Sequence, residues 1–202
     1  MWTKKKLKNF MSLVRVERVE SRRRGRSLVA TLDAAPSQLL LCEEPIAHAP
    51  LPAAADDAHP WATAAALVAA VLDADAEPRT HHLEPRLGLD ELPALEEPAS
   101  AAAFDAAARD VHERYSACAS AATVRRLLHV VSRNALETSG CQALFQLASM
   151  ANHSCRPNAT HQGFRSSSGL PCVCIRAVSP IAEGVEVCIS YIGDLAVPRA
   201  ER

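Results

Sequence analysis

The stretch Met150-Ala-Asn-His-Ser-Cys-Arg-Pro-Asn158 is the part of the sequence that decides the fold. It follows an apolar run and holds two asparagines, a histidine, a serine and a cysteine within seven residues. Pro157 fixes its own backbone torsion and disfavours a helical conformation at Arg156, so a helix cannot continue through the stretch. We therefore expect a constrained loop that leaves a buried element and presents polar side chains, as binding loops usually do.

Two strands are predicted on the C-terminal side of this loop. Residues 173–178 and 185–192 are largely apolar, which is typical of short strands. Ser179-Pro180 and Glu183-Gly184 mark a turn between them. The pattern predicts a β-hairpin whose loop is longer than two residues.

Strands are also predicted on the N-terminal side, over residues 12–47. Residues 12–19 alternate apolar with charged side chains, and a basic turn with one glycine follows at residues 22–26. Residues 28–32 and 38–43 are two further apolar runs, separated by a proline.

The residues between these two β regions are expected to form loops and helices. Residues 48–98 are rich in proline and alanine and indicate loop, with one amphipathic helix at residues 61–72. Residues 99–138 are typical of helix, with Ser100 as the N-cap of a helix over residues 101–117. A second helix follows, and its apolar residues recur with helical spacing, so we expect them in the core. They are Val124, Leu127, Leu128 and Val131.

The bulk composition favours a single domain with an insertion. The chain has 202 residues, of which 49% are hydrophobic and only 4% aromatic. Its seven cysteines, an odd number in a chain of this size, indicate reduced thiols in the nucleus or cytoplasm. We expect no signal peptide and no membrane span, because the longest apolar run, around residues 62–72, is short and rich in alanine.

Charge is distributed unevenly along the chain. Residues 1–26 hold ten Lys/Arg and two Glu, a sum of +8, so the formal net charge of −1 leaves −9 for the remainder. A basic arm on an acidic body favours contact with an anionic surface such as nucleic acid. A solvated N-terminus is the simpler interpretation, and we prefer it. Lysines within residues 4–8 also fit a nuclear localisation patch.

Four stretches resemble one protein family, in the family's own order. Asn152-His-Ser-Cys-x-Pro-Asn158 resembles the signature of SET-domain protein methyltransferases, especially the branch with an inserted MYND zinc finger. Residues 25–31 and 39–45 resemble the opening strands of that domain, and Asn134 resembles an asparagine that precedes the signature. Residues 177–192 resemble the last core strands, with their tyrosine at Tyr191.

The resemblance implies an α+β fold: the β-clip-like SET domain, in which small twisted sheets surround a knot-like crossing and carry a helical insertion. In that crossing, the segment after the tyrosine motif (residues 177–192) threads past the signature loop (residues 152–158). The implied organisation is a basic N-terminal arm (1–11), N-terminal SET strands (12–47), a Pro/Ala-rich and helical insertion (48–138), a C-terminal SET core (139–195) and a truncated tail (196–202).

The resemblance also implies an activity, the methylation of lysine side chains on histone or non-histone proteins with S-adenosylmethionine. Tyr191 matches the catalytic position, where the methyl group passes. No metal is implied at the site, and we expect a monomer that binds a lysine-bearing protein substrate. The residues that match cofactor-binding positions are Arg24, Gly25, Arg26, Asn134, Asn152, His153 and Tyr191.

Such a site fits the chemistry of methyl transfer. The reaction transfers a methyl group from a sulfonium to an amine by in-line displacement of the thioether, so positioning and desolvation supply most of the effect. A tyrosine hydroxyl and backbone carbonyls can orient the amine and the methyl group. Lysine, with a pKa of about 10.4 in water, must lose a proton on entry, and an apolar channel favours that loss.

Departures from the family pattern favour a second function, a catalytically inactive SET-like protein-binding module. Ser27 replaces the second glycine of a Gly-x-Gly turn, and Val185 replaces a glutamate. The chain ends at Arg202, before the expected closing helix and its Cys-x-Cys zinc cluster, and it lacks a MYND finger. Retention of the asparagine, histidine and tyrosine of the two main motifs favours the enzyme.

The remaining cysteines and histidines have simpler interpretations. Cys172 and Cys174 point to one face of a strand, and no partner pair lies at zinc-finger spacing, so we expect strand cysteines rather than metal ligands. Cys155 beside His153 could act as a nucleophile, but nothing supplies an oxyanion site and the family match accounts for both residues. His81-His82 is expected to be exposed in a loop.

Overall fold

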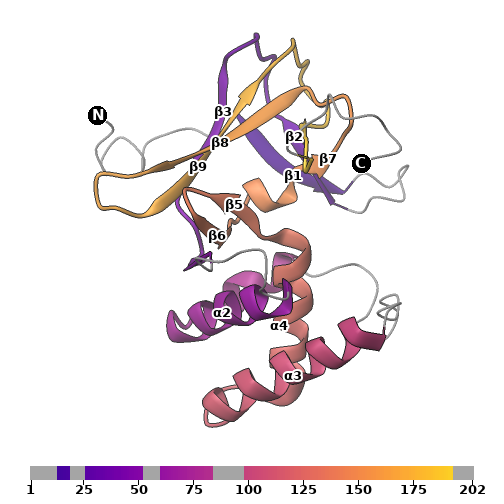
Figure 1. Cartoon of the computed structure of the whole chain (residues 1–202). Helices are drawn as coiled ribbons and strands as arrows, with labels where there is room; N and C mark the ends of the chain where they lie inside the picture. Colours follow the sequence, from indigo (N-terminus) through magenta and orange to yellow (C-terminus); the bar gives the residue numbers. More distant parts are fainter. Residues whose placement is uncertain (1–12, 19–25, 52–59, 84–97, 193–202) are drawn as a thin grey trace. The chain divides into compact units, whose positions relative to one another are not determined.

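Two compact units make up the computed structural model, which describes residues 13–18, 26–51, 60–83 and 98–192 (Figure 1). The split unit combines Met1–Glu44 with Met150–Arg202, and the inserted unit is the continuous stretch Pro45–Ser149. Both units contain strands, and the described α-helices belong to the inserted unit, so the fold mixes α and β as the sequence predicted. None of the described helices is long and apolar enough to cross a membrane.

The main sheet of the split unit has three antiparallel strands in the order β3-β9-β8. They are β3 (Leu39–Glu43), β8 (Ala159–Arg165) and β9 (Pro171–Ala177). Alternate residues of β9, Val173, Ile175 and Ala177, face the core and are buried. An irregularity in the register of β3 allows the consecutive Leu40 and Leu41 both to be buried.

Shorter pairings complete the split unit. They involve β1 (Val14–Arg18), β2 (Arg26–Ala30), β7 (Asn152–His153) and β10 (Cys188–Ile189). β1 and β2 are antiparallel, whereas β7 and β10 are parallel. The segment that precedes β10 bridges to the N-terminal part of the chain, through Glu186 to Val29 and through Ile181 to Ala34. The approach to β10 therefore links β2 with β7.

The inserted unit contains helices and a small antiparallel sheet in the order β4-β6-β5. Its elements are β4 (Ala47–Pro50), α2 (Pro60–Asp73), η1 (Glu77–Leu83), α3 (Pro98–Tyr115), α4 (Ala121–Asn134), β5 (Leu136–Thr138) and β6 (Cys141–Leu144). The 3₁₀ turn η3 (Ala148–Met150) follows, at the point where the chain passes from the inserted unit to the split unit. Ser120 caps α4 by accepting a hydrogen bond from the Thr123 N–H.

The apolar face of α4 confirms the core predicted from helical spacing. Val124, Leu127, Leu128 and Val131 are each at most 1% exposed. Trp61 of α2 and Phe104 of α3 meet edge to face, with ring centroids 4.9 Å apart, and His129 of α4 lies against the Phe104 ring at 4.8 Å. The predicted helix over residues 61–72 is present as α2.

The predicted N-cap at Ser100 is wrong. α3 begins at Pro98, and proline suits the first turn of a helix because its missing N–H would have no partner there. Ser100 lies inside the helix, where its hydroxyl accepts a hydrogen bond from Trp61 Nε1 at 3.3 Å.

The predicted hairpin of residues 173–178 with residues 185–192 is also wrong. The chain does turn there: the Val185 N–H donates to the Ala182 carbonyl, and Gly184 has a φ of +79°. However, the residues on both sides of this turn form backbone hydrogen bonds with residues 28–34 and not with each other as strands. β9 pairs instead with β3 and β8. The sequence does not predict β4, β5, β6 or β8, and β5 lies at the end of the stretch expected to be helical.

Candidate functional site

Parallel pairing of β7 with β10 brings the signature loop and the tyrosine motif side by side. Cys188 lies opposite Asn152, and Ile189 lies opposite His153. A pair of two-residue strands is too short to be stable alone. Side chains from the two motifs must therefore hold the junction together.

Asn158 supplies much of this support from the end of the loop. Its Nδ2 donates to the Glu186 carbonyl at 2.8 Å, and its Oδ1 accepts from the Cys188 N–H at 2.9 Å. Its own carbonyl accepts from the Val178 N–H at 2.8 Å. Asn158 thus acts as a backbone-like bridge between the loop and the approach to β10, which is a role that asparagine amides fill well.

Asn152 connects three segments of the split unit. Its Nδ2 lies 2.8 Å from Glu186 Oε1, 3.2 Å from Ser27 Oγ and 3.2 Å from the Arg26 carbonyl. The buried Ser27 hydroxyl donates to the same Glu186 oxygen at 2.9 Å. Asn152 Oδ1 accepts no hydrogen bond from the described residues, so the amide is fixed by its nitrogen and presents an available oxygen.

His153 is oriented by the backbone of the tyrosine motif. Its Nδ1 accepts a hydrogen bond from the Tyr191 N–H at 3.0 Å, and the two rings lie 5.4 Å apart at an angle of 46°. An accepting Nδ1 assigns the proton of the neutral ring to Nε2, which lies 3.3 Å from Cys155 Sγ. In this tautomer His153 cannot remove a proton from Cys155, which argues against a cysteine nucleophile.

Tyr191 presents an oriented, neutral phenol. Its hydroxyl donates to the Ala151 carbonyl at 2.7 Å, while the residue as a whole is 56% exposed. Burial of the hydroxyl end raises the pKa of Tyr191 above its ordinary value, and the nearby Cys188 and Glu186 act in the same direction. The phenol therefore stays protonated at neutral pH, keeps its bond to Ala151, and has its oxygen lone pairs available.

The structure brings together some of the predicted site residues and leaves others apart. Asn152, His153 and Tyr191 meet, and the Arg26 backbone carbonyl joins them. Asn134 belongs to the inserted unit, where its Nδ2 donates to the carbonyls of Val130 and Leu83. Arg24 and Gly25, as well as the segment expected to form the knot-like crossing, lie outside the described residues.

Asn152, His153 and Tyr191 form a cluster with two further residues, Glu186 and Ser27, that the sequence-based prediction of the site misses. Glu186 accepts from both Asn152 and Ser27, and Ser27 appears in the sequence only as a departure from Gly-x-Gly. Ser27 lies within the extended strand β2, so a side chain is tolerated there. The pairing of a buried serine with a glutamate 159 positions away leaves no local signal in the sequence.

The cluster is suited to holding a polar ligand. It offers an amide oxygen and a neutral phenol, both locked by hydrogen bonds to the protein. Groups that are fixed in this way position a ligand without reorganising when it binds.

Comparison with protein families matches the SET domain model to residues 25–192 of this chain. No curated protein matches it. Among solved structures, the SET domain of LSMT bound to lysine and AdoHcy is similar, with a TM-score of 0.57 and 11% identity, over 91% of this chain and 50% of that one. A candidate histone methyltransferase of Plasmodium falciparum is less similar, with a TM-score of 0.44 and 9% identity, over 92% of this chain and 97% of that one. The chain thus spans about half the length of the LSMT chain that it resembles.

Proposed function

The chain belongs to the SET domain family, and on that premise we propose that it transfers a methyl group from S-adenosylmethionine to a lysine side chain of a protein. Its small antiparallel sheets with helices are those of a SET domain, as the resemblance implied. The comparisons support the family as a whole and do not support the narrower branch with a MYND finger. The observation that carries the proposal is the contact of Tyr191 with the Ala151–His153 loop.

The residues at this contact fit the cofactor. S-adenosylmethionine carries a cationic amino group and an adenine amine, both hydrogen-bond donors, and Asn152 Oδ1 is an acceptor with no partner among the described residues. When bound, the cofactor supplies an electrophilic methyl group on a sulfonium. Asn152 would hold a donor group of the cofactor, and Glu186 would keep the Asn152 oxygen pointed outward by binding its nitrogen.

Tyr191 would orient the reacting amine. Its hydroxyl proton is committed to the Ala151 carbonyl, so its oxygen can accept a hydrogen bond from a substrate N–H. Because burial raises the pKa of Tyr191, the phenol is uncharged at neutral pH. A neutral acceptor holds the amine without stabilising its cation as a phenolate would.

The test compares the two tyrosines of the chain, each of which donates a 2.7 Å hydrogen bond through its hydroxyl. Tyr191→Phe is expected to reduce methyl transfer by about 100-fold, the scale of a misplaced reacting group. Tyr115→Phe removes the bond to Asp73 on the inserted unit and should leave the rate unchanged. The measurement is transfer of a radiolabelled methyl group from S-adenosylmethionine to proteins of a cell extract. Equal rates for both variants would contradict the role of Tyr191.

A second candidate function is a SET-like module that binds its partner without turnover. The exposure of Tyr191, at 56%, favours it, because methyl transfer requires the amine to be desolvated. Calorimetry tests the first function: the enzyme must bind S-adenosylmethionine, so a folded sample that does not bind it excludes methyl transfer by this chain.

A further inference from the structure

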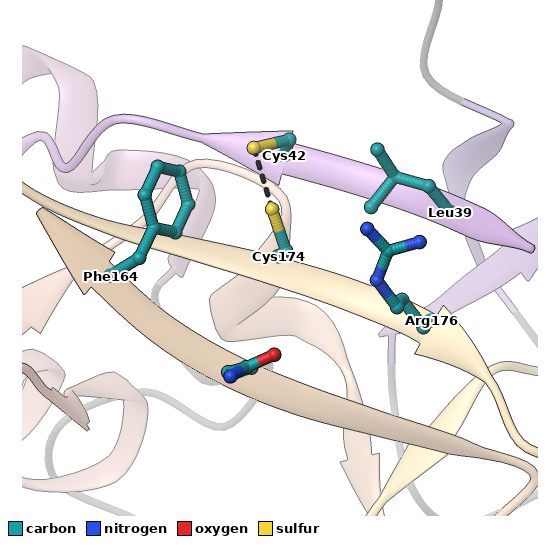
Figure 2. Close-up of a pocket in the computed structure, with 6 residues that line it drawn as sticks. Leu39, Cys42, Phe164, Cys174 and Arg176 are labelled. Carbon is teal, nitrogen blue, oxygen red and sulfur yellow. Dashed lines mark hydrogen bonds between the residues drawn. The ribbon is translucent and has the colours of Figure 1, made fainter. Parts of the chain in front are cut away.

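Two cysteines face each other on neighbouring strands of the main sheet. Cys42 of β3 is the register partner of Cys174 of β9, and their Sγ atoms lie 2.7 Å apart (Figure 2). Opposed residues of an antiparallel pair have Cβ atoms about 4.5–5.5 Å apart. A disulfide needs Cβ atoms roughly 3.5–4.5 Å apart, so only a small adjustment separates these thiols from a bond.

We propose that Cys42 and Cys174 form a modification site, in which a low-molecular-weight disulfide oxidises them to a reversible cross-strand disulfide. Neither cysteine contacts the cluster of Asn152, His153 and Tyr191 in any hydrogen bond of the described residues. The proposal is therefore independent of the methyl-transfer function.

A shallow cavity gives a reagent access to both sulfurs. It has a volume of about 210 Å³ and is lined by Leu39, Cys42, Gln162, Phe164, Cys174 and Arg176. Both cysteines are only partly buried. Figure 2 shows the two sulfurs side by side, with the Phe164 ring on one side and the Arg176 guanidinium on the other. The apolar walls and the Arg176 cation suit an anionic disulfide compound.

The two thiols differ in reactivity. The hydrogen bond between the two thiols lowers the pKa of Cys174, and the positive charge of Arg176 lowers it further, against the opposing effect of burial. The same hydrogen bond and burial raise the pKa of Cys42. Cys174 is thus the thiol that ionises first, and thiolates are the attacking species in exchange.

The reaction proceeds in two balanced exchanges. The Cys174 thiolate attacks one sulfur of the small disulfide, forms a mixed disulfide and releases one small thiolate. Cys42 then loses its proton to solvent and attacks Cys174 Sγ, forming the Cys42–Cys174 bond and releasing the second thiolate. The protein loses two electrons and two protons, and the small disulfide becomes two thiols.

The neighbouring thiol cannot replace Cys42 as the partner. Cys172 lies two residues before Cys174 on β9 and points to the same face, so about 6.6 Å separate the two along the strand. That span exceeds the Cβ separation a disulfide allows. In the described residues no group of three His, Cys, Asp or Glu is placed to hold a metal, which favours exchange over metal binding.

The bond would join the two chain segments of the split unit. Cys42 belongs to the segment before the inserted unit and Cys174 to the segment after it, 132 positions apart. A cross-link over so long a loop restricts the unfolded chain strongly. We expect the oxidised chain to melt roughly 5–15 °C higher than the reduced chain.

The test exposes the folded, reduced chain to oxidised glutathione and maps its cysteines by mass spectrometry of non-reduced peptides. The expected product links the peptide of Cys42 to that of Cys174, and dithiothreitol reverses it. Cys42→Ser should instead give a glutathione adduct on Cys174, whereas the matched control Cys118→Ser, which removes an exposed cysteine, should still give the link.

Three outcomes would overturn the proposal. One is a native chain without the Cys42–Cys174 link, or with a link between other cysteines. Another is a link that forms only in urea. The third is a melting temperature that does not rise on oxidation.

Discussion

At the scale of single residues, one donor–acceptor pair ties the junction of the two motifs to β2. Asn152 Nδ2 donates to Glu186 Oε1 at 2.8 Å, and the Ser27 hydroxyl donates to the same oxygen. A carboxylate that accepts from two fixed donors in a partly buried place contributes more than a neutral bond would. The NH₂ group of Asn152, which donates to Glu186, is therefore as important for the site as the Oδ1 atom that is available to a ligand.

Asn152→Asp tests this pair, because it keeps the shape of the side chain and removes the donor. The new carboxylate would face Glu186, so we expect a loss of roughly 2–3 kcal/mol in the free energy of unfolding, measured by urea denaturation. Adding Glu186→Gln should recover most of the loss, since the glutamine amide can donate to the new aspartate. A double variant as unstable as the single one would contradict the pairing.

The sequence could predict the residues of the junction that lie in motifs, and it could not predict their supports. Asn152, His153 and Tyr191 stand in recognisable stretches. Glu186 and Ser27 also lie in matched stretches, but their supporting roles depend on contacts over 34 and 159 positions, which periodicity and spacing do not reveal. Asn134 matched a family position, but its amide is engaged by backbone carbonyls of the inserted unit.

At the scale of elements, helices were predicted better than strand pairings for a physical reason. The stripe on α4 depends on residues three and four apart, which one short stretch of sequence contains. The partner of β9 depends on which distant strand offers a matching face, and β8 and β3 are separated from each other by the whole inserted unit. The hairpin prediction was wrong because residues 182–185 do form a turn, but the residues on either side of it form backbone hydrogen bonds with residues 28–34.

The α4 stripe should carry much of the stability of the inserted unit. Leu128 is fully buried, so Leu128→Ala is expected to lower the free energy of unfolding by about 2–5 kcal/mol. Leu32→Ala makes the same chemical change at a side chain that is 53% exposed, and should cost no more than about 0.5 kcal/mol. Circular dichroism during urea denaturation measures both. Equal losses would show that burial does not decide the effect.

His129 should make the same helix sensitive to acid. Burial lowers the pKa of His129 below 6.5, and Arg133 and Arg125 act in the same direction. The unfolded chain therefore binds this proton more readily, so stability falls as the pH drops through 6.5 toward the lower folded value. His129→Gln should lose less stability than the wild type between pH 7.5 and pH 5, as measured by urea denaturation. If His129→Gln and the wild type lose the same free energy of unfolding between the two pH values, His129 does not have this role.

At the scale of the whole molecule, the two units differ in how the chain builds them. The inserted unit is one continuous stretch with its own core on α4, whereas the split unit needs both Met1–Glu44 and Met150–Arg202. Compact stretches with their own core commonly fold alone.

A fragment of residues 45–149 should therefore fold by itself. We expect a helical circular dichroism spectrum and a cooperative thermal transition, and Leu128→Ala in the same fragment should lower its midpoint. A fragment that shows no cooperative transition would mean that the inserted unit depends on the split unit for its stability.

The strand β3 has a consequence for how the protein is made. Translation proceeds at about 5–20 residues per second, so roughly 5–20 s pass while the inserted unit is synthesised. During that interval β3, with Leu39, Leu40 and Leu41 in succession, has been synthesised while β9 does not yet exist. An apolar strand with an open edge is a site of aggregation, so the nascent chain carries this hazard at β3 until β9 is made.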